Sequence, residues 1–197
     1  MIQIFAGVSD LPDNIIFNTF INTGRDIFLR GLISSHAGNM SVRIGNRIHI
    51  TKRGSMLGRL KPPDIIELEL DKDDLNLSQA SSETVVHKAI YNKTSALGIV
   101  HAHPPYATLL SMMEDELIPV DSEGSFLFNK VPVLNPEQTI ASEEAADIVS
   151  EGLKDYKIVL VRGHGSFAIG NTLEEAHMFT SSLESSAFFL YHLIKFK

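Results

Sequence analysis

The pattern of apolar and polar positions first indicates a helix near the N-terminus. Residues 11–30 carry apolar side chains at helical spacing, so that one face of the helix can be buried. Asp10 is a candidate cap, Pro12 suits the first turn, and Gly31 is expected to end the helix. We therefore expect the fold to open with an amphipathic helix.

Apolar residues then alternate with polar ones on both sides of Gly45-Asn46, which predicts a tight β-hairpin over residues 42–50. The pattern predicts further strands over residues 65–70, 97–103, 130–136, 156–161 and 167–170, and further helices over residues 81–93, 104–113, 139–154 and 173–196. Thr172 and Glu175 form a candidate capping box for the last helix. This order predicts the α/β class, and the hairpins argue against an all-parallel sheet.

Length and composition are those of one ordinary globular domain, which we place over residues 1–197. The chain is 44% hydrophobic and 21% charged. A net charge of −7 without a basic block argues against a nucleic-acid partner. No apolar run reaches the roughly 18 residues of a membrane span, and the opening MIQIFAGVSD lacks the basic start of a signal peptide. We expect a cytoplasmic protein with no membrane partner.

The chain has no cysteine, so any metal ion must be bound by His, Asp or Glu. His101 and His103 lie two residues apart at the end of a predicted strand, and their imidazoles would face the same way, about 7 Å apart along the backbone. Such a pair alone is more often structural than functional. His164, which lies between two glycines after another buried strand, could complete three ligands with an open fourth position, the pattern of a catalytic zinc site.

Glu83 lies at the start of a predicted helix, directly after Ser81 and Ser82, which are able to cap it. One interpretation is an acidic residue that complements the helix dipole. The other is a carboxylate that moves a proton beside the metal. His87, one turn further on, is interpreted as a packing or hydrogen-bonding residue in preference to a ligand.

Three turns built from small residues could cradle an anion with their backbone amides. They are residues 37–39, Arg53 with Gly54, and Ser81 with Ser82. Each turn is common by itself. Their presence in one short chain with a candidate metal site favours a phosphorylated ligand.

Five short motifs, taken in order, resemble those of the class II aldolase/adducin family. They are GNMSV, ITKRG, SSE, HAH and HG, and the similarity extends from about Gly24 to about Tyr191. The resemblance implies a three-layer α/β/α fold with a mainly antiparallel central sheet. It also implies a homotetramer with active sites between neighbouring subunits.

The resemblance assigns the candidate site residues. His101, His103 and His164 match zinc ligands, one ion per subunit. Glu83 matches the acid/base carboxylate, which can also contact the metal. The positions matching the phosphate-binding loops are Gly38, Asn39, Arg53, Gly54, Ser81 and Ser82.

The implied reaction is reversible cleavage of a ketose 1-phosphate, such as L-fuculose 1-phosphate, to dihydroxyacetone phosphate and an aldehyde. Zinc would stabilise an enediolate while Glu83 moves the proton at its carbon. Three alternatives are a 4-epimerase of ketose phosphates, a dehydratase of methylthioribulose 1-phosphate, and a non-catalytic adducin-like interaction module. The motif SSE favours the aldolase over the epimerase, which has Asp at that position, and intact histidines argue against the interaction module.

Three features differ from the aldolase pattern. Arg53 replaces a Thr or Ser, Glu123 falls near the place of an expected tyrosine, and the sequence given stops at Lys197, before a tail that carries another tyrosine in the aldolase. These differences affect the expected specificity for the aldehyde more than the expected metal chemistry.

Overall fold

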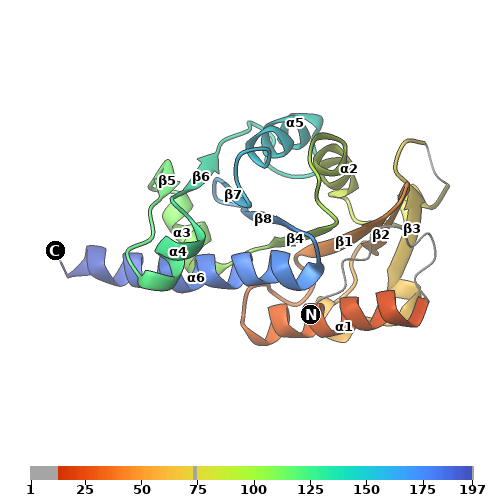
Figure 1. Ribbon diagram of the computed structural model, residues 1–197, viewed down its shortest axis with the longest axis horizontal. Helices are drawn as coiled ribbons and strands as arrows, with labels where there is room; N and C mark the ends of the chain where they lie inside the picture. Colours follow the sequence, from red (N-terminus) through yellow and green to blue (C-terminus); the bar gives the residue numbers. More distant parts are fainter. Residues whose placement is uncertain (1–12, 73–74, 197) are drawn as a thin grey trace.

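An eight-stranded sheet forms the centre of the computed structural model, which describes residues 13–72 and 75–196 (Figure 1). The strands are β1 (Asn39–Ile44), β2 (Arg47–Thr51), β3 (Ile65–Glu69), β4 (Gly98–Ala102), β5 (Glu116–Leu117), β6 (Val131–Leu134), β7 (Ile158–Val161) and β8 (Gly165–Gly170). Their order is β3-β2-β1-β4-β8-β7-β6-β5. Neighbouring strands are antiparallel except β6 and β7, which are parallel. The prediction of a mainly antiparallel sheet is confirmed.

Helices cover both faces of this sheet. They are α1 (Asp13–Leu29), α2 (Thr84–Lys93), α3 (Pro105–Ser111), α4 (Ser122–Leu127), α5 (Glu143–Gly152) and α6 (Leu173–Lys195), with short 3-10 helices η1 (Leu57–Arg59), η2 (Pro62–Asp64) and η3 (Leu75–Ser78). Helices α2 and α5 lie together on one face, and α1, α3, α4 and α6 lie on the other (Figure 1). The fold is therefore the predicted three-layer α/β/α arrangement.

The alternation of side chains along β4 divides the core and places the first candidate ligand. Val100 and Ala102 point into the apolar layer beside α1 and α6, whereas Ile99 points into the layer beside α2 and α5. His101 has the same parity as Ile99 and shares its face. Burial of one large aliphatic side chain stabilises the fold by about 1.5–3 kcal/mol, so the register of β4 is well determined and His101 is fixed with it.

Most predicted elements form, with shifted ends. Gly31 has φ +68° just after α1, and Gly45 has φ +60° in the β1–β2 turn, conformations that glycine adopts without a steric cost. The proposed roles of Asp10 and Pro12 lie outside the described residues. Elements β5 and α4 had no counterpart in the sequence analysis.

The two predicted helix caps form only in part. Thr172 Oγ1 accepts a hydrogen bond from the Glu175 amide at 3.1 Å, but the Glu175 carboxylate turns to Asn171 rather than to Thr172. At α2 the N-cap residue is Glu83, without a side-chain cap, and Ser81 Oγ accepts from its amide at 3.2 Å. Ser81 therefore caps a backbone amide at the start of α2, as expected, although the residue in the N-cap position is Glu83.

None of the helices in residues 13–72 and 75–196 combines the length and the apolar character needed to cross a membrane. The assignment of residues 1–197 to one domain stays a prediction.

Candidate active site

Two histidines meet where β4 ends. The strand stops at Ala102, so His103 lies just beyond it rather than within it, and its backbone amide donates to the Leu32 carbonyl at 2.8 Å. The side chains still converge, because the Nε2 atoms of His101 and His103 are 3.0 Å apart. His101 Nδ1 is 2.9 Å from the Ser166 carbonyl oxygen, which can only accept. Nδ1 therefore carries the proton, and Nε2 presents its lone pair to His103.

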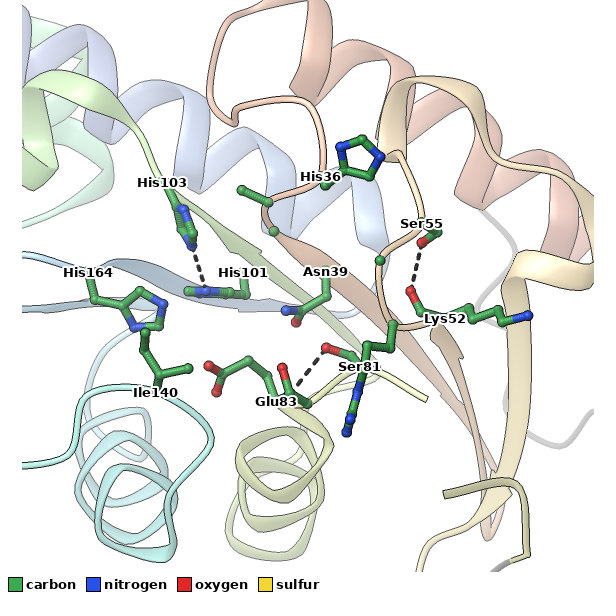
Figure 2. Close-up of a pocket in the computed structure, with 15 residues that line it drawn as sticks. His36, Asn39, Lys52, Ser55, Ser81, Glu83, His101, His103, Ile140 and His164 are labelled. Carbon is green, nitrogen blue, oxygen red and sulfur yellow. Dashed lines mark hydrogen bonds between the residues drawn. The ribbon is translucent and has the colours of Figure 1, made fainter. Parts of the chain in front are cut away.

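The turn between β7 and β8 brings a third imidazole to the same place. His164 follows Gly163, which has φ +67°, and its amide donates to the Val161 carbonyl at 3.0 Å. One ring nitrogen from each of His101, His103 and His164 lies within 4.8 Å of the others (Figure 2). Gly165 permits this approach, since a Cβ there would be 2.7 Å from His103 Cδ2.

These three histidines fit a divalent metal ion. Burial lowers the pKa of each imidazole, that of His103 to about 4 with the charge of His164 as a second cause, so the rings are neutral near pH 7 and offer lone pairs. Neutral imidazoles whose ring nitrogens converge are what a zinc-type site with an open position requires.

The Glu83 carboxyl group points toward the histidines from the start of α2 (Figure 2). Its side chain is buried, with 3% exposed. Oε1 accepts from the Ala141 amide at 3.1 Å, whereas Oε2 is buried with no partner in the described part of the chain. Burial raises the pKa of Glu83 to about 7, although the Ala141 hydrogen bond opposes this. A carboxyl group with one fixed oxygen and one free oxygen suits proton transfer.

The predicted phosphate loops form the wall opposite the histidines. Asn39 begins β1 and is paired with His101 in the β1–β4 ladder. The register of these two strands therefore fixes the position of the loop before β1 relative to the histidines. Gly38 has φ +75°, and a Cβ there would lie 2.9 Å from the His101 carbonyl oxygen, so only glycine fits. The Arg53 amide donates to the Gln79 carbonyl at 2.9 Å. Because Gln79 lies two residues before Ser81, this hydrogen bond places Arg53 and Gly54 next to the serines of the wall.

All the predicted site residues line one cavity of about 200 Å³ (Figure 2). They are Gly38, Asn39, Arg53, Gly54, Ser81, Ser82, Glu83, His101, His103 and His164. Four lining residues were not predicted, namely His36, Lys52, Ser55 and Ile140. His36, Lys52 and Ser55 flank predicted turns and could have been found by that proximity. Ile140 carries no signal in the sequence. Glu123 lies on α4 and is not among the residues that line this cavity.

The fold and the cavity define a three-layer α/β/α protein with three histidines that could hold a metal ion, beside a wall of small residues. A family model described as "Class II Aldolase and Adducin N-terminal domain" matches residues 18–191. The chain belongs to this family, as its motifs predicted.

Solved structures and curated relatives support the same family assignment. A crystal structure of L-fuculose-1-phosphate aldolase from Thermus thermophilus is 41% identical, has a TM-score of 0.87, and covers 91% of this chain and 94% of its own. An L-fuculose phosphate aldolase of Methanococcus maripaludis is 32% identical over 85% of this chain and 92% of its own. These similarities confirm the prediction of a metal-dependent enzyme of the class II aldolase type.

Other relatives carry different activities in their names. A 3-oxo-tetronate 4-phosphate decarboxylase of Haemophilus influenzae is 33% identical over 85% of this chain and 82% of its own. A methylthioribulose-1-phosphate dehydratase of Methylococcus capsulatus is 31% identical over 83% of this chain and 87% of its own. The dehydratase was among the alternatives drawn from the sequence, and the decarboxylase was not.

Proposed function

We propose that this protein is a zinc-dependent aldolase that cleaves a ketose 1-phosphate, L-fuculose 1-phosphate or a close analogue, reversibly to dihydroxyacetone phosphate and an aldehyde. The observation that carries the proposal is the arrangement within one cavity of three neutral imidazoles, a buried carboxyl group and a wall of small residues with backbone amides. The 41% identity to an L-fuculose-1-phosphate aldolase supports the choice of substrate.

His101, His103 and His164 would hold the ion, with Glu83 able to contact it before substrate arrives. When bound, a zinc ion supplies Lewis-acid chemistry, which polarises a carbonyl group and stabilises negative charge that develops beside it. Three protein ligands leave room for substrate oxygens. No cysteine competes for the ion in this chain.

Glu83 would carry the proton in both directions. As the bond between C3 and C4 breaks, the C4 hydroxyl would lose its proton to water and its oxygen would become the aldehyde carbonyl. The protonated carboxyl group of Glu83 would then deliver a proton to C3, and its carboxylate would remove that proton in the condensation direction. A pKa raised to about 7 by burial means that both forms are populated near neutral pH before an ion binds. The Ala141 amide holds Oε1, so that Oε2 is the oxygen left for this transfer.

The loops would hold the phosphate group. Gly38, Gly54, Ser81 and Ser82 bring backbone amides and hydroxyls to the wall, Asn39 adds a side-chain amide, and Arg53 adds a positive charge. The pairing of Asn39 with His101 sets the spacing between the phosphate group and the reacting carbons.

We further propose a cytoplasmic homotetramer with active sites between neighbouring subunits. The support for assembly is an apolar surface on the second half of α6, where Phe188, Phe189, Leu193 and Ile194 are each between 41% and 51% exposed. Clusters of this kind mark association surfaces more often than free surface. The cytoplasmic location stays a prediction from the sequence.

Product analysis with zinc-loaded protein and a panel of ketose phosphates tests the reaction. We expect L-fuculose 1-phosphate to yield dihydroxyacetone phosphate and lactaldehyde. Inversion at C4, loss of water or release of carbon dioxide from the matching substrates would instead assign the protein to the epimerase, dehydratase or decarboxylase reaction.

The variant Glu83→Gln tests the proton carrier in the same assay. It should keep its zinc and lose about 10²- to 10⁴-fold in turnover, the typical contribution of a general acid or base. Near-normal turnover would show that another group moves the proton.

A further inference from the structure

A chain of buried polar groups runs from α2 to β1 beneath the anion-binding wall. Tyr91 Oη is 2.8 Å from Ser41 Oγ, Ser41 Oγ is 2.6 Å from His87 Nδ1, and His87 Nε2 is 2.6 Å from Asn39 Oδ1. Ser41 and His87 are fully buried, Tyr91 is 1% exposed and Asn39 is 7% exposed. Only Asn39 takes part in the mechanism proposed above, so the other three groups need a separate explanation.

The direction of these hydrogen bonds follows from counting donors. Burial raises the pKa of Tyr91 far above its usual value and lowers that of His87 to about 3, so the chain consists of a phenol, a hydroxyl and a neutral imidazole. Within the described residues, the hydroxyl of Tyr91 has no hydrogen-bond partner besides Ser41. If the imidazole proton were on Nδ1, it would donate to Ser41, and one of the two hydroxyl protons, that of Ser41 or that of Tyr91, would be buried without an acceptor. An unmade buried hydrogen bond of this kind costs about 1–3 kcal/mol.

The opposite direction satisfies every proton in the chain. Tyr91 donates to Ser41, Ser41 donates to His87 Nδ1, and the proton on His87 Nε2 is donated to Asn39 Oδ1. The amide oxygen of Asn39 is then held toward the protein interior. Its amide nitrogen, for which the described residues provide no hydrogen-bond acceptor, faces the cavity.

The orientation of this amide matters for what binds. A phosphate oxygen at physiological pH accepts hydrogen bonds, so it is attracted to the N–H₂ group of Asn39 and repelled by its carbonyl oxygen. Asn39 alone could present either group, because the two ends of an amide have nearly the same shape. A carboxylate in place of the imidazole, or no partner at all, would not impose the same choice.

We propose that Tyr91, Ser41 and His87 are positioning residues that lock the Asn39 amide with its N–H₂ group toward the cavity, and so make this end of the site selective for an anionic oxygen group such as phosphate. The proposal deepens the proposed function and rests on its assignment of the anion-binding wall. None of the three residues contacts the substrate in this account. They act through Asn39.

The tautomer of His87 is the most direct test, because it requires neither substrate nor activity. A two-bond ¹H–¹⁵N spectrum of the labelled protein reports which ring nitrogen carries the proton, and His87→Gln identifies the signal by its loss. We expect the tautomer protonated on Nε2. A proton on Nδ1, or a doubly protonated ring near neutral pH, would overturn the proposal.

Binding of inorganic phosphate to the zinc-loaded protein, measured by calorimetry, tests the consequence. His87→Leu should weaken binding about tenfold with the zinc content unchanged. His87→Gln should stay within about threefold of the wild type, because one amide can donate to Asn39 and accept from Ser41. Ser150→Ala, which removes a fully buried hydroxyl from α5, is the matched control and should bind phosphate like the wild type. Wild-type affinity in His87→Leu would refute the positioning role.

Ser41→Ala provides a smaller change if His87→Leu does not fold. Without the hydroxyl that donates to His87 Nδ1, the donor count no longer favours one tautomer, so the His87 spectrum should show both tautomers and phosphate affinity should fall about twofold. A spectrum unchanged from that of the wild type would contradict the donor count. If the wild type itself fails to bind phosphate while His87 is protonated on Nε2, the anion-binding wall of the proposed function is wrong, and the orientation of the amide still stands.

Discussion

Replacement of Glu83 by glutamine should stabilise the metal-free protein increasingly as pH rises above 4.5, with the full effect above pH 7. The Glu83 side chain is 3% exposed, and its pKa rises from 4.5 to about 7 because burial disfavours the carboxylate. Below pH 4.5 the group is protonated in both the folded and the unfolded chain and has no effect. Between pH 4.5 and 7 only the unfolded chain releases the proton, so the free energy of unfolding falls as pH rises.

The magnitude follows from the two pKa values. A difference of about 2.5 pH units corresponds to about 3 kcal/mol, which is lost in full above pH 7. Glu83→Gln is neutral at every pH and its side-chain oxygen can still accept from the Ala141 amide. The variant should therefore match the wild type within about 1 kcal/mol near pH 4.5 and exceed it by up to about 3 kcal/mol at pH 8.

Urea denaturation followed by circular dichroism, with EDTA-treated protein at one fixed concentration, measures this difference at pH 4.5, 6 and 8. Glu174→Gln, in the exposed first turn of α6, is the control and should change the free energy of unfolding by about 0.5 kcal/mol or less at each pH. A Glu83→Gln effect that is equal at all three pH values would refute the reasoning, as would a variant less stable than the wild type at pH 8.

Three further predictions concern the metal, the wall and the assembly. His103→Ala should lower the zinc content of the purified protein, measured by plasma mass spectrometry, and full occupancy would remove this residue from the ligands. Gly38→Ala should lower the free energy of unfolding by about 2–4 kcal/mol, since its Cβ would lie 2.7 Å from Ile33 Cγ2 at φ +75°. Gly31→Ala, at φ +68° with open space around it, should cost only about 1 kcal/mol in the same denaturation experiment, and equal costs would contradict the steric argument. Phe189→Glu on α6 should reduce the molar mass in light scattering, and an unchanged mass would exclude this surface as the interface.

The parts of the site that the sequence predicted are those whose chemistry is carried by residue type. His101, His103 and His164 could be grouped because imidazole is the strongest metal ligand left in a chain without cysteine. Gly38 could be placed in a tight turn because few other residues fit one. The order of helices and strands followed from periodicity, which is strongest in long amphipathic segments such as α1.

The parts that were missed depend on contacts between distant segments. Strand β5 has two residues and α4 has six, too few to show a period. The Ala141 amide meets Glu83 only because the loop before α5 turns back at φ +51°, a conformation that alanine rarely adopts and that no local pattern predicts. His103 leaves the strand early because its amide bonds to the Leu32 carbonyl instead of to a neighbouring strand.

The central claim is that one divalent ion sits among three histidines at the end of β4. Anomalous X-ray diffraction at the zinc absorption edge, from crystals of the purified protein, tests it most directly. We expect one strong peak per subunit, bounded by the rings of His101, His103 and His164 and facing the Glu83 carboxyl group. A peak elsewhere, or none in crystals grown with zinc in excess, would contradict it.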